Sequence, residues 1–192
     1  MKLVAVSQWV DNYPDYYERR DAVDQKLNSF LHLSGLQPLP VPNCLSVSHD
    51  KNKRKEIVLN WLKQIGIRAI VLSGGNNIGN YPERDETENW LLDYAEKLQL
   101  PVLGICRGMQ VMGVRSGGKL TEVSGHVRTN HKVTGVLSGV MNSYHNFCFT
   151  SCPSDYEMLA ISTDGCIEAI RHRMLPWEGW MWHPERYKTF KE

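Results

Sequence analysis

The sequence predicts an α/β protein with a parallel sheet in its first part and antiparallel strands in its last part. Through residue 116, short apolar runs alternate with segments of helical periodicity, joined by short links. This alternation is typical of parallel strands with right-handed crossovers. After Gly117-Gly118 the chain alternates apolar and polar residues among Gly and Asn, which favours antiparallel strands or loops. A chain of 192 residues is the right size for one domain with a sizeable core, so we expect a single domain over 1–192.

Each element of the first part has its own local signal. Apolar runs predict strands at 3–7, 39–42, 69–72 and 101–105. Apolar spacing predicts helices from Asp21 to a stop at Gly35, over 51–65 with Gly66 at its end, over 85–98, and over 109–115. Residues 8–20 are polar and aromatic and are expected to form a loop.

The last part is predicted to be built from short strands. Residues 123–136 should form antiparallel strands or loops. Segments 158–162 and 166–171 flank Asp164-Gly165, which is a hairpin signal. Residues 180–182 are expected to be a final strand that delivers His183.

Composition excludes several classes of function. The formal net charge is +1, so no overall field favours nucleic acid or a membrane surface. The apolar start is too short for a signal peptide, and no stretch could span a bilayer. With five cysteines, an odd number, we expect a reduced cytoplasmic protein with free thiols. Cys148 and Cys152 are four residues apart, but no second pair with zinc spacing accompanies them.

Cys106 lies in the segment Gly104-Ile105-Cys106-Arg107-Gly108, directly after an apolar run. Glycines on both sides allow a sharp turn between a strand and a helix, as in nucleophile elbows. The sulfur would then lie at a helix N-terminus, which favours an anion, and the thiolate is the nucleophilic form. A lone cysteine is more often a buried structural residue, but this glycine frame favours a nucleophile.

A thiolate nucleophile needs a base, and His183-Pro184-Glu185 near the end of the chain supplies one. His183 would accept the thiol proton and later protonate the leaving group. Glu185 would hold the imidazole in one tautomer. Another glycine turn, Ser73-Gly74-Gly75, follows a predicted strand. The N–H groups of Gly75 and Arg107 could form an oxyanion hole, although an ordinary turn explains these glycines about as well.

Together these motifs resemble those of class I glutamine amidotransferase-like proteins, in the γ-glutamyl hydrolase (peptidase C26) branch. The resemblance spans essentially the whole chain and rests on motifs that occur in this order: Leu72-Ser73-Gly74-Gly75, Glu83-Arg84-Asp85-x-x-Glu88, Gly104 to Gln110, Ser143-Tyr144-His145 and His183-Pro184-Glu185. It implies a flavodoxin-like three-layer αβα sandwich with a mostly parallel central sheet and a C-terminal antiparallel portion. It also implies cysteine-dependent cleavage of a γ-glutamyl amide through a glutamyl thioester that releases glutamate, with Cys106, His183 and Glu185 as a triad.

The resemblance further implies which residues hold the substrate. Gln110 and the main chain at Ser143 and Tyr144 would bind the glutamyl group. The rest of the implied substrate-binding set is Gly74, Asn76, Arg84 and His145. Arg84, Asp85 and Glu88 would shape the mouth of the site, although a charged helix start with surface pairs explains Asp85 and Glu88 equally well.

The implied substrate is γ-glutamyl-CDP-amidate, from capsule phosphoramidate synthesis. A γ-glutamyl amine of the γ-aminobutyrate type is an alternative, and so is a glutaminase role that feeds ammonia to a separate synthase. A non-catalytic sensor is disfavoured by the intact triad. The chain departs from the pattern at Asn146-Phe147 and over 112–116, and it is short for the branch, which leaves the leaving group open.

A nucleotide leaving group would need cations and a stacking surface. Arginine suits phosphate, so Arg19, Arg20 and Arg128 are the candidates, with Lys132 as a further cation. Tyr13, Tyr16 and Tyr17 could stack on a base. Arg115 is better explained as a solvated helix residue.

No metal or organic cofactor is expected. His126 and His131 could suggest a metal pair, but they lie on an irregular segment without an evident acidic partner. The expected partners are a small γ-glutamyl molecule, with a nucleotide conjugate as one option, and a second copy of the chain in a homodimer, but neither nucleic acid nor a membrane.

Overall fold

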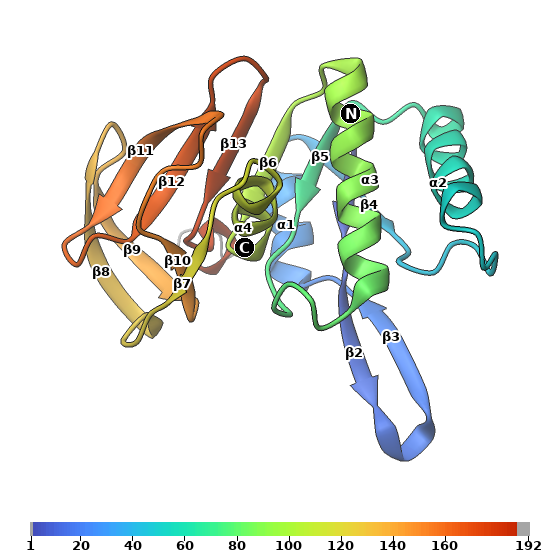
Figure 1. Cartoon of the computed structure of the whole chain (residues 1–192), viewed down its shortest axis with the longest axis horizontal. Coiled ribbons are helices and arrows are strands. Elements are labelled where there is room, and N and C mark those ends of the chain that lie inside the picture. The colour runs from blue at the N-terminus through green and yellow to red at the C-terminus, as the bar shows by residue number, and fades with distance from the viewer. Residues whose placement is uncertain (1, 188–192) are drawn as a thin grey trace.

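The computed structural model describes residues 2–187, and its centre is one long mixed sheet (Figure 1). Its strands run in the order β4-β1-β5-β6-β13-β12-β11-β8-β9, with β10 and β7 attached beside β12. The first five of these strands are mutually parallel: β4 (Leu36–Val41), β1 (Lys2–Ser7), β5 (Ala69–Leu72), β6 (Val102–Ile105) and β13 (Trp177–Trp180).

Helices cover both faces of the parallel half. Helix α1 (Gln25–Leu33) packs on one face, where Leu27 and Leu31 meet Val4 and Val6. The other face carries α2 (Lys51–Ile65), α3 (Pro82–Leu98) and α4 (Arg107–Arg115). Strand residues alternate between the two faces, as the two-residue period of a strand requires. The predicted three-layer αβα sandwich is therefore confirmed.

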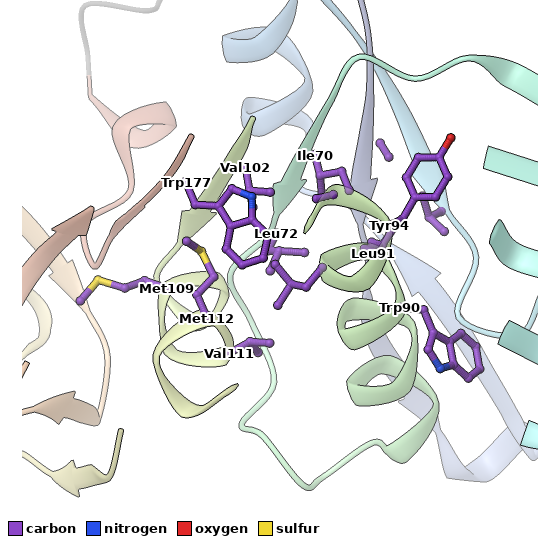
Figure 2. Close-up of a cluster of buried hydrophobic side chains, with 14 of the residues drawn as sticks. Ile70, Leu72, Trp90, Leu91, Tyr94, Val102, Met109, Val111, Met112 and Trp177 are labelled. Atoms are coloured by element: carbon purple, nitrogen blue, oxygen red, sulfur yellow. The ribbon is translucent and has the colours of Figure 1, made fainter. Parts of the chain in front are cut away.

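The larger core lies between the sheet and these three helices. Figure 2 shows Leu72 of β5, Leu91 of α3, Met112 of α4 and Trp177 of β13 gathered in this layer, and all four are at least 97% buried. This packing fixes α4 against the sheet, and α4 begins directly after Cys106. The core thereby sets the position of the predicted nucleophile.

The antiparallel half continues the same sheet from β13. It contains β12 (Ile167–His172), β11 (Tyr156–Ser162), β8 (Val127–Gly135) and β9 (Gly139–Tyr144), with the short strands β7 (Leu120–Glu122) and β10 (Phe147–Phe149) beside it. Strand β13 pairs in parallel with β6 and antiparallel with β12. It therefore joins the two halves.

Most predicted elements are confirmed, with small shifts at their ends. The helices over 51–65 and around 85–98 and the hairpin around Asp164-Gly165 are present, and Gly66 ends α2 with a φ of 72°. The final strand lies at 177–180 rather than 180–182, and the helix expected from Asp21 begins at Gln25. These differences concern boundaries and leave the topology unchanged.

The predictions for residues 8–20 and for the cysteines were wrong. Residues 8–20 are not a loop: β2 (Trp9–Tyr13) and β3 (Glu18–Ala22) form a hairpin around the short 3-10 helix η1 (Pro14–Tyr16), and it projects from the body (Figure 1). Most residues of this hairpin are exposed and polar, so its sequence lacks the apolar alternation by which strands are predicted. The five thiols are also not all free, because β10 and β12 are neighbours and a disulfide links Cys148 to Cys166.

Among residues 2–187, no helix has both the length and the apolar character needed to cross a membrane.

Candidate active site

Cys106 lies at the sharp turn between β6 and α4. Its φ of 51° and ψ of −107° form a strained backbone conformation that is rare for a residue with a side chain. The flanking glycines are sterically required. A Cβ on Gly104 would lie 2.6 Å from the Gly108 carbonyl carbon, and a Cβ on Gly108 would lie 2.7 Å from the Cβ of Leu72. The predicted elbow is thus present, with each glycine filling a space that admits no larger residue.

His183 lies just after β13, beside Cys106. Asn142 of β9 holds the histidine backbone at both ends: its Nδ2 donates to the His183 carbonyl at 2.8 Å, and its Oδ1 accepts from the His183 N–H at 2.8 Å. Glu185 follows in the short 3-10 helix η2 (Pro184–Arg186), and its Oε1 is 2.6 Å from His183 Nδ1. Both side chains are about 95% buried.

Cys106, His183 and Glu185 therefore lie together, with the His183 ring hydrogen-bonded to Glu185 and close enough to Cys106 to interact with it. Burial by itself lowers the pKa of His183, but its hydrogen bonds to Cys106 and Glu185 outweigh this and raise the pKa to about 9. The imidazole consequently holds its proton at neutral pH. A protonated imidazole in this position can donate its proton to a leaving nitrogen.

The glycine turn after β5 faces this series. A Cβ on Gly74 would lie 2.7 Å from His183 Cε1, so only glycine allows the histidine to come so close. Gly75 has a φ of 113°, and a Cβ there would lie 2.7 Å from Trp9 Cε3. Arg84 supports the turn from below, because its Nη2 donates to the carbonyls of Ser73 and Gly74 at 2.9 Å each.

A buried ion network lies beneath the elbow. Glu88 is fully buried and accepts hydrogen bonds from Ser7 Oγ at 2.8 Å, from Arg84 Nε at 3.1 Å and from Arg107. Arg107 also pairs with Asp85. Burial lowers the pKa of Arg84 to about 10 and that of Arg107 to about 9. The expectation of surface pairs for Asp85 and Glu88 is wrong for Glu88, because α3 packs this acid against β1.

A cleft of about 440 Å³ opens above these groups. Seven of the residues singled out from the sequence line it: Gly74, Gly75, Cys106, Arg128, Tyr144, His183 and Glu185. The structure thus brings together the predicted nucleophile, base and orienting acid with one of the predicted cations. The sequence could not show this directly, because the residues come from both halves of the sheet.

Four residues of the implied substrate-binding set have partners within the protein instead. Arg84 is fully buried under the glycine turn, and Asn76 ties that turn to the hairpin through the backbone of Val10. Gln110 Nε2 donates to the Phe147 carbonyl at 2.9 Å. His145 is 97% buried away from the cleft. None of these four side chains lines the cleft.

Ser143 is also fully buried, and its Oγ donates to the His126 carbonyl at 2.7 Å. Tyr144, its neighbour, reaches the cleft, and its ring packs edge-on against the His183 ring with centroids 5.5 Å apart. Arg107 follows Cys106 directly, so its backbone N–H lies at the start of α4, while its side chain is occupied in the buried network.

The candidate leaving-group cations separate into two places. Arg19 and Arg20 lie on β3, away from the cleft, and pair with Glu83 and Glu18. Tyr16 and Tyr17 at the hairpin tip are 75% and 100% exposed. Arg128 lines the cleft, and its guanidinium has no ion pair or hydrogen bond with the rest of residues 2–187. Arg115 pairs with Asp93 and Glu96, which agrees with its interpretation as a helix surface residue.

The sequence did not single out Trp9, Asp24 or Arg186, which also line the cleft. Arg186 follows the His-Pro-Glu motif directly and lies over the Tyr144 ring, 4.4 Å from its centroid. That adjacency is a signal that could have identified it. Trp9 lies on the hairpin that was expected to be a loop, so its position depended on the element that was missed.

A second group of polar side chains is buried in the antiparallel half. Three histidines and one acid bring one atom each to within 4.8 Å of one another: His126, His131, His145 and Glu168, which we call the histidine–glutamate cluster. The absence of an acidic partner for His126 and His131 was therefore a wrong inference. Glu168 is distant in sequence but lies on β12, and its ion-pair distances to all three histidines are under 4 Å.

The fold and site define an α/β protein with a thiol–imidazole–carboxylate series at the carboxyl edge of parallel strands. The model of the family "Glutamine amidotransferase class-I" matches residues 42–192, and the chain belongs to this family. Glutamine amidotransferase-type hydrolysis is the chemistry of this family.

Relatives with known names differ in what they do. The chain is 30% identical over 137 residues to γ-glutamyl-CDP-amidate hydrolase of Campylobacter jejuni, covering 68% of each chain. It is 31% identical over 143 residues to anthranilate synthase component 2 of Thermococcus kodakarensis, covering 69% of this chain and 73% of the relative.

Solved structures support the same fold. A glutamine amidotransferase from Thermotoga maritima superimposes with a TM-score of 0.65 at 14% identity, covering 96% of this chain and 76% of the other. A glutamine amidotransferase from Methylobacillus flagellatus gives a TM-score of 0.64 at 14% identity, with 98% and 72% covered.

Proposed function

We propose that this protein hydrolyses a γ-glutamyl amide with Cys106, His183 and Glu185 as its catalytic triad. The observation that carries the proposal is that these three side chains line one cleft, with His183 hydrogen-bonded to Glu185 and the cysteine on a strained elbow. Membership of the family supports amide cleavage as the reaction.

The thiolate of Cys106 attacks the γ-carbonyl carbon and forms a tetrahedral intermediate. His183 gives its proton to the departing nitrogen, so the C–N bond breaks and a glutamyl thioester remains on Cys106. His183 then takes a proton from water, whose oxygen attacks the thioester and releases glutamate and the thiolate. Glu185 keeps Nδ1 of the ring protonated, so Nε2 faces the sulfur throughout.

Backbone N–H groups would stabilise the oxyanion. The first α4 helical bond is from Gln110 N to Cys106 O, so the N–H of Arg107 has no acceptor within the helix. The turn at Gly75 faces the same cleft. We assign the oxyanion hole to the N–H groups of Gly75 and Arg107, held in place by the Arg84 and Glu88 network beneath them.

For the leaving group we propose a phosphate-bearing nucleotide, with γ-glutamyl-CDP-amidate as the substrate. The unpaired guanidinium of Arg128 in the cleft supports an anionic leaving group. Trp9, which is 37% exposed and lines the same cleft, offers a stacking surface for a base. The similarity to the C. jejuni hydrolase supports the same choice.

A second candidate is a glutaminase subunit that supplies ammonia to a synthase. The similarity to anthranilate synthase component 2 favours it. The two candidates differ in what the isolated chain does, because a subunit of this kind would need its partner for full activity.

The test is glutamate release by the purified chain from glutamine, γ-glutamyl-γ-aminobutyrate, γ-glutamyl-CDP-amidate and a γ-glutamyl peptide. We expect the highest kcat/KM with the nucleotide amidate. Preference for the amine conjugate would overturn the choice of leaving group but keep the reaction. Cleavage of none of the four, also after reduction of the protein, would overturn the free-standing hydrolase.

A further inference from the structure

The histidine–glutamate cluster has the spacing of a metal site. His145 Nε2 is 3.3 Å from His126 Nδ1 and 3.3 Å from Glu168 Oε1. The same Oε1 is 3.4 Å from His131 Nε2 and 3.7 Å from His126 Nδ1. Four donors around a tetrahedral ion with bonds of about 2.0–2.1 Å lie about 3.3 Å apart, so the cluster is already near this arrangement.

In two of the histidine rings, the nitrogen that points away from the cluster has a hydrogen-bond acceptor beside it. His126 Nε2 is 2.6 Å from the Asp164 carboxylate, and His145 Nδ1 is 3.1 Å from the Phe147 carbonyl oxygen. Both partners only accept, so each ring places its N–H there. In the neutral rings, His126 Nδ1 and His145 Nε2 then both present lone pairs, and they face each other. Two lone pairs cannot form a hydrogen bond, whereas a cation between them satisfies both.

The acid of the cluster faces only the cluster. Glu168 is fully buried on β12, and its ion-pair contacts among the described residues are with the three histidines, none of which forms a hydrogen bond of regular geometry with it. His131 Nε2 is likewise buried without one. A buried carboxylate costs free energy unless a cation or several donors compensate it. The Glu168 carboxylate points into the same space as the three ring nitrogens.

We propose that the histidine–glutamate cluster binds one divalent metal ion of the zinc type in a tetrahedral site with three nitrogen ligands and one oxygen ligand. Imidazole and carboxylate ligands suit Zn²⁺. Four protein ligands close the coordination, which is typical of structural rather than catalytic zinc. The site lies outside the cleft and has no part in the proposed thioester chemistry.

The position of the site gives it a structural role. His145 directly follows Tyr144, whose ring packs against His183, and its N–H donates to the His126 carbonyl at 3.1 Å. Glu168 lies on β12, next to the strand that delivers His183. One ion would therefore hold together the segments 126–131 and 143–145 and the strand β12, which form the wall of the cleft on the antiparallel side.

The test is the zinc content of the full chain, produced with zinc in the medium and measured by mass spectrometry of the metal. The Cys106→Ser variant is used as the parent, because a reactive thiol and His183 could themselves capture zinc. We expect one zinc per chain in this parent and in a control with His32→Asn, an exposed histidine on α1. Adding Glu168→Gln should reduce bound zinc at least tenfold.

A milder variant separates loss of metal from loss of fold. Asp164→Asn keeps the shape of the side chain but weakens the acceptor of the His126 N–H, so we expect zinc affinity to fall about 10- to 100-fold. In the parent, Co²⁺ should give the intense visible absorption of a tetrahedral site. Removing the ion with a chelator should lower Tm, and Zn²⁺ should restore it whereas Mg²⁺ should not.

Two outcomes would overturn the proposal. The first is a parent that contains less than about a tenth of an equivalent of metal and whose Tm does not respond to added Zn²⁺. Imidazolium–carboxylate pairs alone would then hold the cluster together. The second is a Glu168→Gln variant that stays folded and retains a full equivalent of zinc.

Discussion

The two halves of the sheet contribute to the cleft in different ways. The parallel half contributes backbone: a strained elbow at Cys106, a glycine turn at 74–75 and the N–H groups at the start of α4. The antiparallel half contributes side chains, among them Tyr144, and through β13 it positions His183. Backbone geometry is fixed by local sequence and a packed core, whereas side-chain groups depend on which distant strands become neighbours.

The two halves also differ in how their buried charges are compensated. Behind the elbow lies a network of ions in which each buried arginine has a carboxylate partner. Behind the opposite wall lies a cluster whose carboxylate has no hydrogen-bond partner among the described residues. In the first wall, protein groups neutralise the buried arginines. In the second, the unsatisfied carboxylate is the basis of the metal proposal.

The largest effect on activity is expected from a change at Cys106, which lies where the two halves of the sheet meet. Cys106→Ser should lower glutamate release by about 10³-fold or more, since the weaker hydroxyl nucleophile replaces the thiolate. The exposed Cys44→Ser is the matched control and should keep activity within about twofold. Near-normal turnover by the Cys106 variant, measured in the same glutamate assay, would rule out the thioester route.

Removing the shared acid of the parallel half should cost stability. Glu88→Gln leaves Arg84 and Arg107 buried without their common carboxylate, and we expect the free energy of unfolding to fall by about 3–5 kcal/mol. Glu86→Gln, on the same helix, breaks only partly exposed pairs and should cost less than about 1 kcal/mol. Urea denaturation measures both, and equal losses would contradict the contrast drawn here.

On the other side of the cleft, the pH dependence reports on His183. Its pKa is raised to about 9 in the folded protein, so the stabilisation from its partners is complete below the unfolded value near 6.5 and is lost as the pH rises through about 9. We expect the free energy of unfolding to fall over this range. Glu185→Gln removes one partner, so the fall should be shallower and glutamate release about 10- to 10³-fold slower. An unchanged pH profile in this variant would show that Glu185 does not act on the ring.

The smallest effect concerns the leaving group. Arg128→Ala should raise KM for the nucleotide amidate about tenfold, with little change for glutamine, because only the former presents phosphate to this cation. Arg19→Ala on the hairpin is the control and should leave both KM values unchanged. An equal rise for both substrates would instead place Arg128 against the glutamyl group.

The sequence predicted features that depend on neighbouring residues better than features that depend on contacts between distant strands. Cys106 and its glycines were predicted because strand, turn and helix signals lie within a few residues of each other. His183 and Glu185 were predicted through a short motif that resembles a family motif. The burial and internal contacts of Arg84, Gln110 and His145 were not predicted, because they depend on segments far away in the sequence. The acid of the histidine–glutamate cluster was missed for the same reason.

The place of β13 in the sheet has a consequence for the biosynthesis of the protein. All other strands precede it in the chain, yet it lies in the middle of the sheet, between β6 and β12. During translation the elbow with its thiol leaves the ribosome well before the strand that carries the base. Cys106 and His183 can therefore become neighbours only after residues 177–185 have been synthesised and β13 has inserted between β6 and β12.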